Sequence, residues 1–146
     1  MAVSINGCDT LQGKGPCTMK ESPLRVVIVD DEPQICELLK TYLQSISGNF
    51  DIYVFSDPEE ARAFLLQDAP DILITDFKMP KFDGLQLMKL MPEDSIKVLI
   101  SGYVSEIIES QLRALKALFL EKPVTLKQLG ALIHKAEAGR KSRQCG

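Results

Sequence analysis

The chain has 146 residues, a formal net charge of −3, and 45% hydrophobic and 25% charged residues. A chain of this length buries about 68–70% of its unfolded surface in one core, which leaves no room for a second large domain. The composition excludes a disordered or fibrous chain, and no apolar run approaches the roughly 20 residues that cross a bilayer. A pI of about 5.2 gives no overall basic surface, so we expect neither direct nucleic-acid binding nor membrane insertion.

In chain order, residues 1–23 lack periodicity and predict a flexible N-terminal extension. Five short apolar runs rich in β-branched residues predict buried strands at Leu24–Val29, Phe50–Phe55, Ile72–Thr75, Lys97–Ile100 and Leu118–Leu120. Amphipathic or capped segments between and after them predict helices at Pro33–Gln44, after Asp57, at Asp83–Leu87, at Ser105–Lys116 and after Val124. Residues 139–146 turn basic and predict a solvated C-terminal tail or a truncated linker.

Helix starts are marked by capping residues. A cap of this kind pairs an N-cap side chain with an acid or amide three residues later. The pairs are Asp57 with Glu60, Asp83 with Gln86, and Thr125 with Gln128.

The alternation of five strands with five helices predicts an α/β fold. Each right-handed crossover lays its helix on the sheet, so the expected architecture is a doubly wound, five-stranded parallel sheet with helices on both faces. We expect this folded domain to span residues 24–138.

Polar side chains follow four of the five predicted strands, where a doubly wound sheet binds its ligand. Asp30 and Asp31 follow the first strand, Asp76 the third, Ser101 the fourth and Lys122 the fifth. Adjacent strands are about 4.8 Å apart, so these groups come within reach of one another if the first and third strands are neighbours.

Three clustered carboxylates require a cation, because each pair about 5 Å apart repels by roughly 3 kcal/mol at an effective dielectric near 20. Oxygen ligands without histidine or cysteine favour Mg²⁺. A carboxylate beside Mg²⁺, a lysine and a hydroxyl suits attack on a phosphoryl group. Asp76 is the best nucleophile because it ends a central strand, which leaves Asp30 and Asp31 to hold the metal.

Each of these residues also has a simpler interpretation. Asp31 alone is more typical of a helix N-cap, with Gln34 completing a capping box. Asp76 and Ser101 would then be turn residues, and Lys122 the start of a loop. Their coincidence at one end of the sheet favours a functional site.

In the segments that contain these residues, the chain resembles the receiver domain of bacterial two-component response regulators. The matching stretches are Val26–Pro33, Ile72–Pro80 with Phe82–Gly84, Val98–Gly102 and Phe119–Pro123. The resemblance covers about residues 24–138. It implies a flavodoxin-like fold with strand order 2-1-3-4-5.

The resemblance also implies site roles. Asp76 would accept a phosphoryl group, and Mg²⁺ would be held by Asp31, Asp76 and the Lys78 backbone carbonyl, with Asp30 acting through water. Ser101 and Lys122 would contact the phosphoryl oxygens.

Phe119 would change its rotamer as Ser101 moves, and would pass this conformational change to the face of the fourth helix, fifth strand and fifth helix. Lys78 and Tyr103 stand where receivers set the lifetime of the phosphoryl group. The bond between Lys122 and Pro123 is usually cis in such proteins. Ala117–Leu118 replaces the Gly-Ala pair that often precedes the switch aromatic.

Other classes fit the sequence less well. A flavodoxin-type nucleotide binder needs hydrogen-bond donors in the first loop, where Asp30 and Asp31 would repel a phosphate. An aspartate-nucleophile phosphatase needs a D-x-D motif after the first strand, which is absent. His134 has no potential ligand at metal-site spacing and is expected on a helix surface.

The expected partners follow from the resemblance. A histidine kinase or a histidine phosphotransfer protein would donate the phosphoryl group, and the chain would catalyse its own phosphorylation and slow dephosphorylation without being a conventional enzyme. The output would be docking of a downstream protein, with homodimerisation on phosphorylation as a further route. Alternatively, the chain is the receiver fragment of a multidomain regulator or hybrid histidine kinase whose output domain is absent.

The four cysteines, at positions 8, 17, 36 and 145, are scattered and form no disulfide framework. The N-terminus carries no secretory signal pattern. We therefore expect a reduced, cytoplasmic setting.

Overall fold

The computed structural model describes the backbone of residues 23–46, 49–102 and 104–145, and their side chains as far as residue 135. Strands and helices alternate along this part of the chain. The strands are β2 (Leu24–Val29), β3 (Phe50–Phe55), β4 (Ile72–Asp76), β5 (Ile96–Ser101) and β6 (Leu118–Glu121). The helices are α2 (Pro33–Ser45), α3 (Pro58–Gln67), α4 (Gly84–Met88), α5 (Glu106–Ala114) and α6 (Leu126–Cys145).

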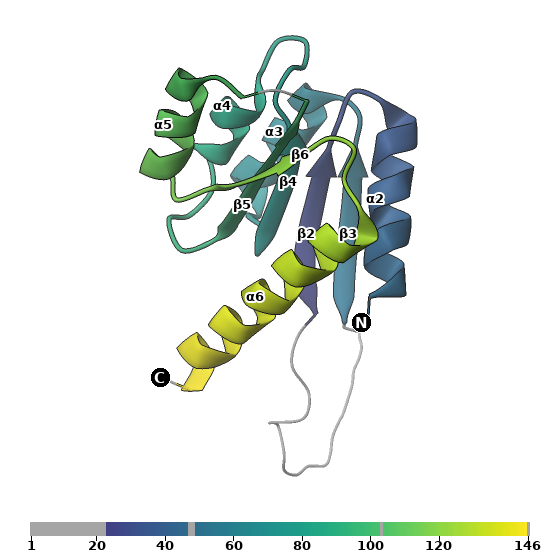
Figure 1. Ribbon diagram of the computed structural model, residues 1–146, viewed down its shortest axis with the longest axis vertical. Helices are drawn as coiled ribbons and strands as arrows, with labels where there is room; N and C mark the ends of the chain where they lie inside the picture. Colours follow the sequence, from purple (N-terminus) through teal and green to yellow (C-terminus); the bar gives the residue numbers. More distant parts are fainter. Residues whose placement is uncertain (1–22, 47–48, 103, 146) are drawn as a thin grey trace.

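The strands form one parallel sheet in the order β3-β2-β4-β5-β6, as Figure 1 shows. In order of appearance this is 2-1-3-4-5, so the predicted topology is confirmed. Val29 of β2 pairs with Thr75 of β4, and Asp76 of β4 pairs with Ile100 of β5. The first and third strands are therefore neighbours, and their carboxyl ends lie together.

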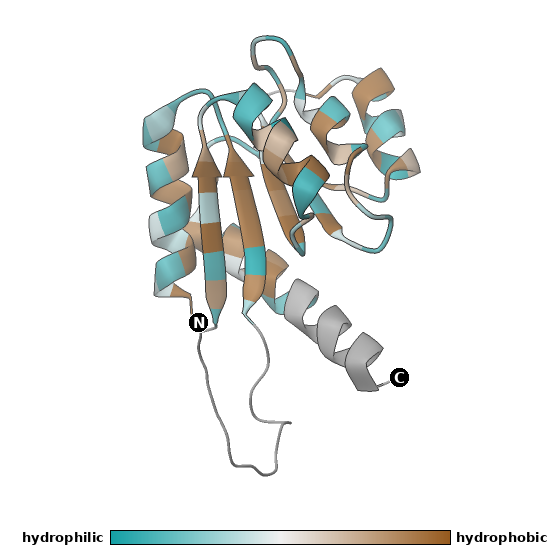
Figure 2. Cartoon of the chain, turned by 180° about the vertical axis from the view of Figure 1, so that it is seen from behind, coloured by the Kyte–Doolittle hydropathy of each residue, from teal (hydrophilic) through white to brown (hydrophobic). Residues whose placement is uncertain are grey.

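Alternate residues of the central strands enter two separate hydrophobic cores. Val26 and Ile28 face a core that α2 and α6 cover, whereas Val27 and Val29 face the core under α3, α4 and α5. Figure 2 shows the apolar character of the strands between these layers. Because both faces are buried, the strands read as continuous apolar runs in the sequence.

Hydrogen bonds confirm two predicted capping boxes. Asp83 accepts from the backbone N–H of Gln86, whose side chain accepts from the N–H of Asp83, each at 2.9 Å. The same reciprocal pair joins Thr125 and Gln128, at 3.0 and 3.1 Å.

The first helix begins differently from the capping interpretation of Asp31. Its N-cap is Glu32, with no side-chain capping hydrogen bond, and Pro33 fills the first turn. Asp31 therefore does not cap α2.

Lys97 is an exception to the apolar pattern of β5, since it is only 2% exposed. Its Nζ donates to the carbonyl oxygens of Pro92, Glu93 and Ser95 at 3.2–3.3 Å. These three acceptors use all the hydrogens of the ammonium group, which explains how a lysine can lie in the interior.

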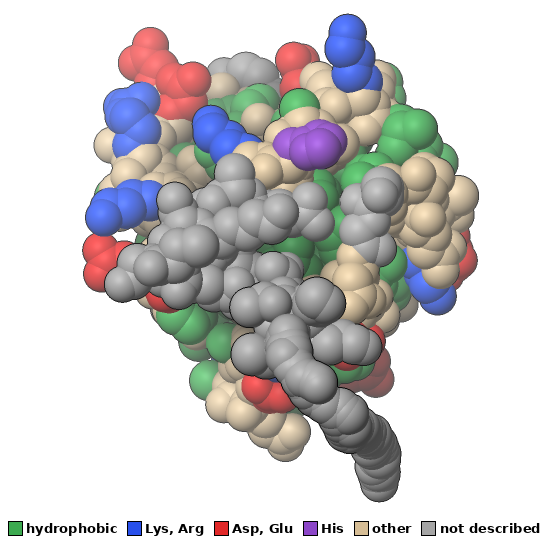
Figure 3. Space-filling view, turned by 90° about the horizontal axis from the view of Figure 1, so that it is seen from below, with side chains coloured by type: hydrophobic (Ala, Val, Ile, Leu, Met, Phe, Trp, Pro, Cys, Tyr) green, Lys and Arg blue, Asp and Glu red, His purple; other side chains and the backbone are tan. Residues whose placement is uncertain are grey.

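The last helix, α6, extends through residues 139–145, so this part of the predicted tail has a helical backbone. Its His134 is exposed, and the view from below in Figure 3 shows the histidine at the surface.

The predicted N-terminal extension lies, up to residue 22, outside the described residues. No helix in the described part of the chain has the length and apolar character needed to cross a membrane.

Candidate functional site

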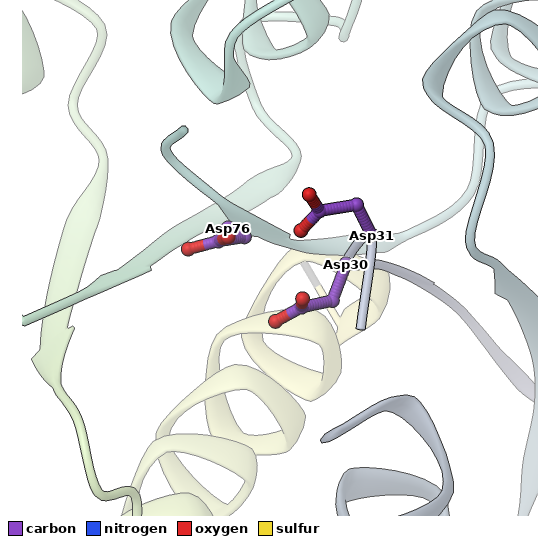
Figure 4. A group of neighbouring side chains, drawn as sticks. All are labelled: Asp30, Asp31 and Asp76. Atoms are coloured by element: carbon purple, nitrogen blue, oxygen red, sulfur yellow. The ribbon is translucent and has the colours of Figure 1, made fainter. Parts of the chain in front are cut away.

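Three carboxylates meet at the carboxyl ends of β2 and β4. Asp30 and Asp31 directly follow β2, and Asp76 is the last residue of β4. One oxygen from each lies within 4.8 Å of the others, and Figure 4 shows the three side chains in one group. It is the one cluster among the described residues with three or more side chains able to hold a metal ion.

Lys122, immediately after β6, supplies the positive charge of this cluster. Its Nζ lies 3.4 Å from Asp30 Oδ2, 3.3 Å from Asp76 Oδ1 and 3.9 Å from Glu32 Oε1. The backbone N–H of Lys122 donates to the Ser101 carbonyl at 2.9 Å, which fixes the lysine to the end of β5. The Lys122–Pro123 bond is cis, as the resemblance implied.

The carboxylates differ in exposure. Asp30 is 1% exposed, Asp76 is 8% exposed as a residue and 11% over its side chain, and Asp31 is exposed. Burial disfavours the charged form of an acid. Burial raises the pKa of Asp30 to about 6, against the opposing effects of the Glu32 N–H and Lys122.

Asp76 and the half-buried Lys122 affect each other's pKa. Burial raises the pKa of Asp76, although Lys122 acts to lower it. Burial acts to lower the pKa of Lys122, but the attraction of Asp30 and Asp76 together outweighs it, so this pKa is raised. One ammonium group therefore neutralises only part of the local negative charge.

A further cation fits these residues. Asp30 Oδ1 accepts from the Glu32 N–H at 2.9 Å, but Oδ2 is buried and receives no hydrogen bond from any described group, even with Lys122 nearby. A buried carboxylate oxygen that accepts no hydrogen bond is costly unless an ion or water completes its surroundings. Oxygen-only donors at this spacing match the preference of Mg²⁺.

Asp76 is held from one side. Its Oδ1 accepts the N–H of Phe77 at 3.0 Å and lies next to Lys122. Within the described residues, Oδ2 receives no hydrogen bond. Gly84 closes the following loop by donating to the Phe77 carbonyl at 2.9 Å, and a Cβ at Gly84 would lie 2.5 Å from the Asp76 carbonyl oxygen.

The predicted switch residues lie on the two neighbouring strands β5 and β6. Ser101, half-buried, ends β5 opposite Glu121. Phe119 lies on β6, pairs with Leu99 and is 37% exposed, because it points away from the core that Leu118 and Leu120 contact.

The modulating positions are only partly described. Lys78 is exposed, in the loop after β4, and Tyr103 lies outside the described residues.

Sequence reasoning missed two neighbours of the site. Glu32 lies near Lys122, and the signal for it was its place in the same acidic loop. Cys36 is buried behind the loop, where its thiol donates to the Asp30 carbonyl at 3.3 Å. Nothing in a single cysteine predicts that contact.

The chain is similar in sequence to known proteins. The chain is 29% identical over 122 residues to a probable C4-dicarboxylate response regulator, DctR, from Halalkalibacterium halodurans, covering 81% of this chain and 53% of that protein. It is 38% identical over 104 residues to a protein-glutamate methylesterase/protein-glutamine glutaminase from Anaeromyxobacter dehalogenans, covering 70% of this chain and 28% of that one. The chain thus spans about half of the first relative and a smaller part of the second.

A CheY-like response regulator receiver domain protein from Methanospirillum hungatei has the same fold. Its crystal structure superposes with a TM-score of 0.72 at 24% identity, covering 83% of this chain and 99% of that one. The sequence model of the response regulator receiver domain matches residues 26–134. The chain therefore belongs to the response regulator receiver domain family.

Proposed function

We propose that this receiver domain accepts a phosphoryl group on Asp76. The observation that carries the proposal is the position of Lys122 Nζ, 3.3 Å from Asp76 Oδ1 and 3.4 Å from Asp30 Oδ2, inside a cluster of three carboxylates. An ammonium group so placed neutralises charge where phosphoryl oxygens would gather. Asp76 Oδ2, which accepts no hydrogen bond from the described residues, would be the attacking atom.

The transfer forms an Asp76 Oδ2–phosphorus bond. The phosphorus–nitrogen bond of a phosphohistidine breaks, and its electron pair stays on the imidazole. Asp30 and Asp31, with Asp76 and the carbonyl of Lys78, would hold Mg²⁺. When bound, the metal supplies positive charge to the phosphoryl oxygens.

The donor is the phosphohistidine of a histidine kinase or a phosphotransfer protein, in the cytoplasm. Ser101 and Lys122 would contact the phosphoryl oxygens. The change would pass through Phe119 to the face of α5, β6 and α6, for a downstream protein, a second copy or an attached output domain. Lys78 and Tyr103 would set how fast water removes the phosphoryl group.

Incubation with acetyl phosphate and Mg²⁺, followed by intact mass, tests the acceptor. We expect one added HPO₃ in the native chain and none in Asp76→Asn. Asp57→Asn is the matched control, because Asp57 lies outside the cluster and asparagine also caps helices. An adduct that forms equally fast in Asp76→Asn would refute the assignment of Asp76.

A further inference from the structure

The loop between β4 and α4, residues 77–83, is joined by side chains to the neighbouring helix α3. Lys81 Nζ forms an ion pair with Glu59 Oε1 at 3.2 Å. The Arg62 guanidinium lies over the Phe82 ring, 5.5 Å from its centroid. Glu59 and Arg62 are three residues apart and so share one side of α3.

Helix α3 is a firm support for this loop. Ala61 is fully buried and Leu65 is 3% exposed, both in the core under α3, α4 and α5. Figure 1 shows α3 and α4 side by side, and residues of the two helices are in contact. The two side-chain contacts therefore connect the loop to a part of the fold that cannot move without disturbing the core.

The middle of the loop has few other restraints. Its ends are fixed by Phe77, which donates to the Ile100 carbonyl, and by Gly84, which donates back to the Phe77 carbonyl. Within residues 78–82, the one backbone–backbone hydrogen bond between described residues runs from the Phe82 N–H to the Pro80 carbonyl, whereas Asp83 is held by its capping box with Gln86. The part of the backbone that includes Lys78 is therefore held mainly by the side-chain contacts of Lys81 and Phe82.

Lys81 itself adopts a conformation that needs support. Its φ is 72°, in the left-handed region that a residue with a Cβ rarely occupies. Such a conformation persists when the surroundings hold it, and it is frequent near functional sites. The ion pair with Glu59 and the cation–π contact at the next residue supply that support.

We propose that Glu59 and Arg62 are positioning residues that hold Lys81 and Phe82, and thereby keep the Lys78 carbonyl arranged for divalent-cation binding beside Asp76. This inference rests on the proposed function. It concerns α3, none of whose residues is among those proposed to hold the cation or the phosphoryl group. If the loop adopts the conformation that binds the cation for only a fraction of the time, the affinity for the cation is reduced by that fraction.

Mg²⁺ titration by calorimetry tests the proposal. Glu59→Gln and Glu60→Gln remove the same charge one residue apart, but Glu60 has no ion pair or hydrogen bond to the loop among the described contacts. We expect Glu59→Gln to raise the Kd about twofold over Glu60→Gln, which is the range of an exposed ion pair. Adding Arg62→Ala should raise it about fivefold in total.

Two further variants separate positioning from a general loss of stability. Lys81→Gly removes the ion pair but accepts a positive φ, whereas Lys81→Ala removes the pair and keeps the strain, so Lys81→Ala should weaken Mg²⁺ binding more. In the Glu59 and Arg62 variants, amide hydrogen exchange should be faster than in the native chain at residues 78–82 and unchanged in β4. The urea midpoint should move little, because the ion pair is exposed and Phe82 is only half-buried.

The outcomes distinguish this proposal from the one on which it rests. If the native chain binds Mg²⁺ and takes up phosphate, but the Glu59 and Arg62 variants match Glu60→Gln in Kd, the positioning role is overturned alone. If the native chain binds no Mg²⁺, both proposals are overturned. Lowered affinity with equally lowered global stability would also refute the positioning role.

Discussion

Asp30→Asn should stabilise the metal-free protein, although it removes a residue of the proposed site. Burial raises the pKa of Asp30 from 3.8 to about 6. A difference of about two pKa units corresponds to roughly 3 kcal/mol, at 1.36 kcal/mol per unit. This is the upper limit of what the ionised carboxylate costs the folded state above pH 6.

Proton binding at Asp30 decides whether stability rises or falls with pH. Between pH 3.8 and about 6 the folded state binds more protons at Asp30 than the unfolded state does. Stability from this group is therefore greatest below 3.8 and falls as the pH rises through 6. Asparagine keeps the acceptor for the Glu32 N–H but carries no charge, so the variant should be more stable at pH 7.5. We expect a gain of about 1–2 kcal/mol, below the upper limit, because Lys122 loses a partner.

Urea unfolding with EDTA at pH 7.5 and pH 5 measures this gain. The native chain should become more stable at pH 5, and the variant should respond less, with a remainder from Asp76, whose pKa is also raised. Mg²⁺ at 100 times the Kd of the native chain should stabilise that chain by about 2.7 kcal/mol, and it should stabilise the variant by less. A variant that is less stable than the native chain in EDTA at pH 7.5 would refute the reasoning.

Three other predictions test the packing and chemistry around the site. Gly84→Ala should lower the free energy of unfolding by about 2 kcal/mol, since its Cβ would meet the Asp76 carbonyl oxygen; urea unfolding checks this, and Gly130→Ala, which meets nothing within 4 Å in α6, should be neutral or stabilising. Lys122→Ala should slow phosphate uptake from acetyl phosphate about 100-fold, as does loss of a group that stabilises transition-state charge; an unchanged rate by intact mass would contradict its role. Burial raises the pKa of the Cys36 thiol to about 11, so peptide mapping after iodoacetamide at pH 8 should find it unlabelled in the folded chain and labelled in urea; equal labelling in both states would show that it is accessible.

Local patterns in the sequence predicted most of the fold. Runs such as Leu24–Val29 are apolar because both sheet faces are covered, and capping pairs such as Thr125 with Gln128 satisfy backbone groups within four residues. The position of the acidic cluster followed from strand ends. These features depend on neighbours along the chain or on a simple rule of topology.

The remaining features depend on contacts between distant segments. Lys97 looked like a strand residue at the start of an apolar run, and its burial depends on three carbonyls of the preceding turn. Glu32, rather than Asp31, is the N-cap of α2, because the Glu32 carbonyl accepts from the N–H groups of Ile35 and Cys36, and periodicity alone does not show this. No local pattern could show that Arg62 lies over Phe82, since they meet only after α3 and the β4–α4 loop have packed.

The charge arrangement at the site links the cation to phosphorylation. One ammonium group, Lys122, lies near Asp30, Glu32 and Asp76, and it cannot balance all of them. A phosphoryl group on Asp76 would add negative charge and draw Lys122 toward it, which would leave the buried Asp30 with less compensation. Cation binding and phosphorylation should therefore strengthen each other, and by linkage the phosphorylated chain should bind Mg²⁺ more tightly by the same factor as Mg²⁺ favours the phosphorylated form.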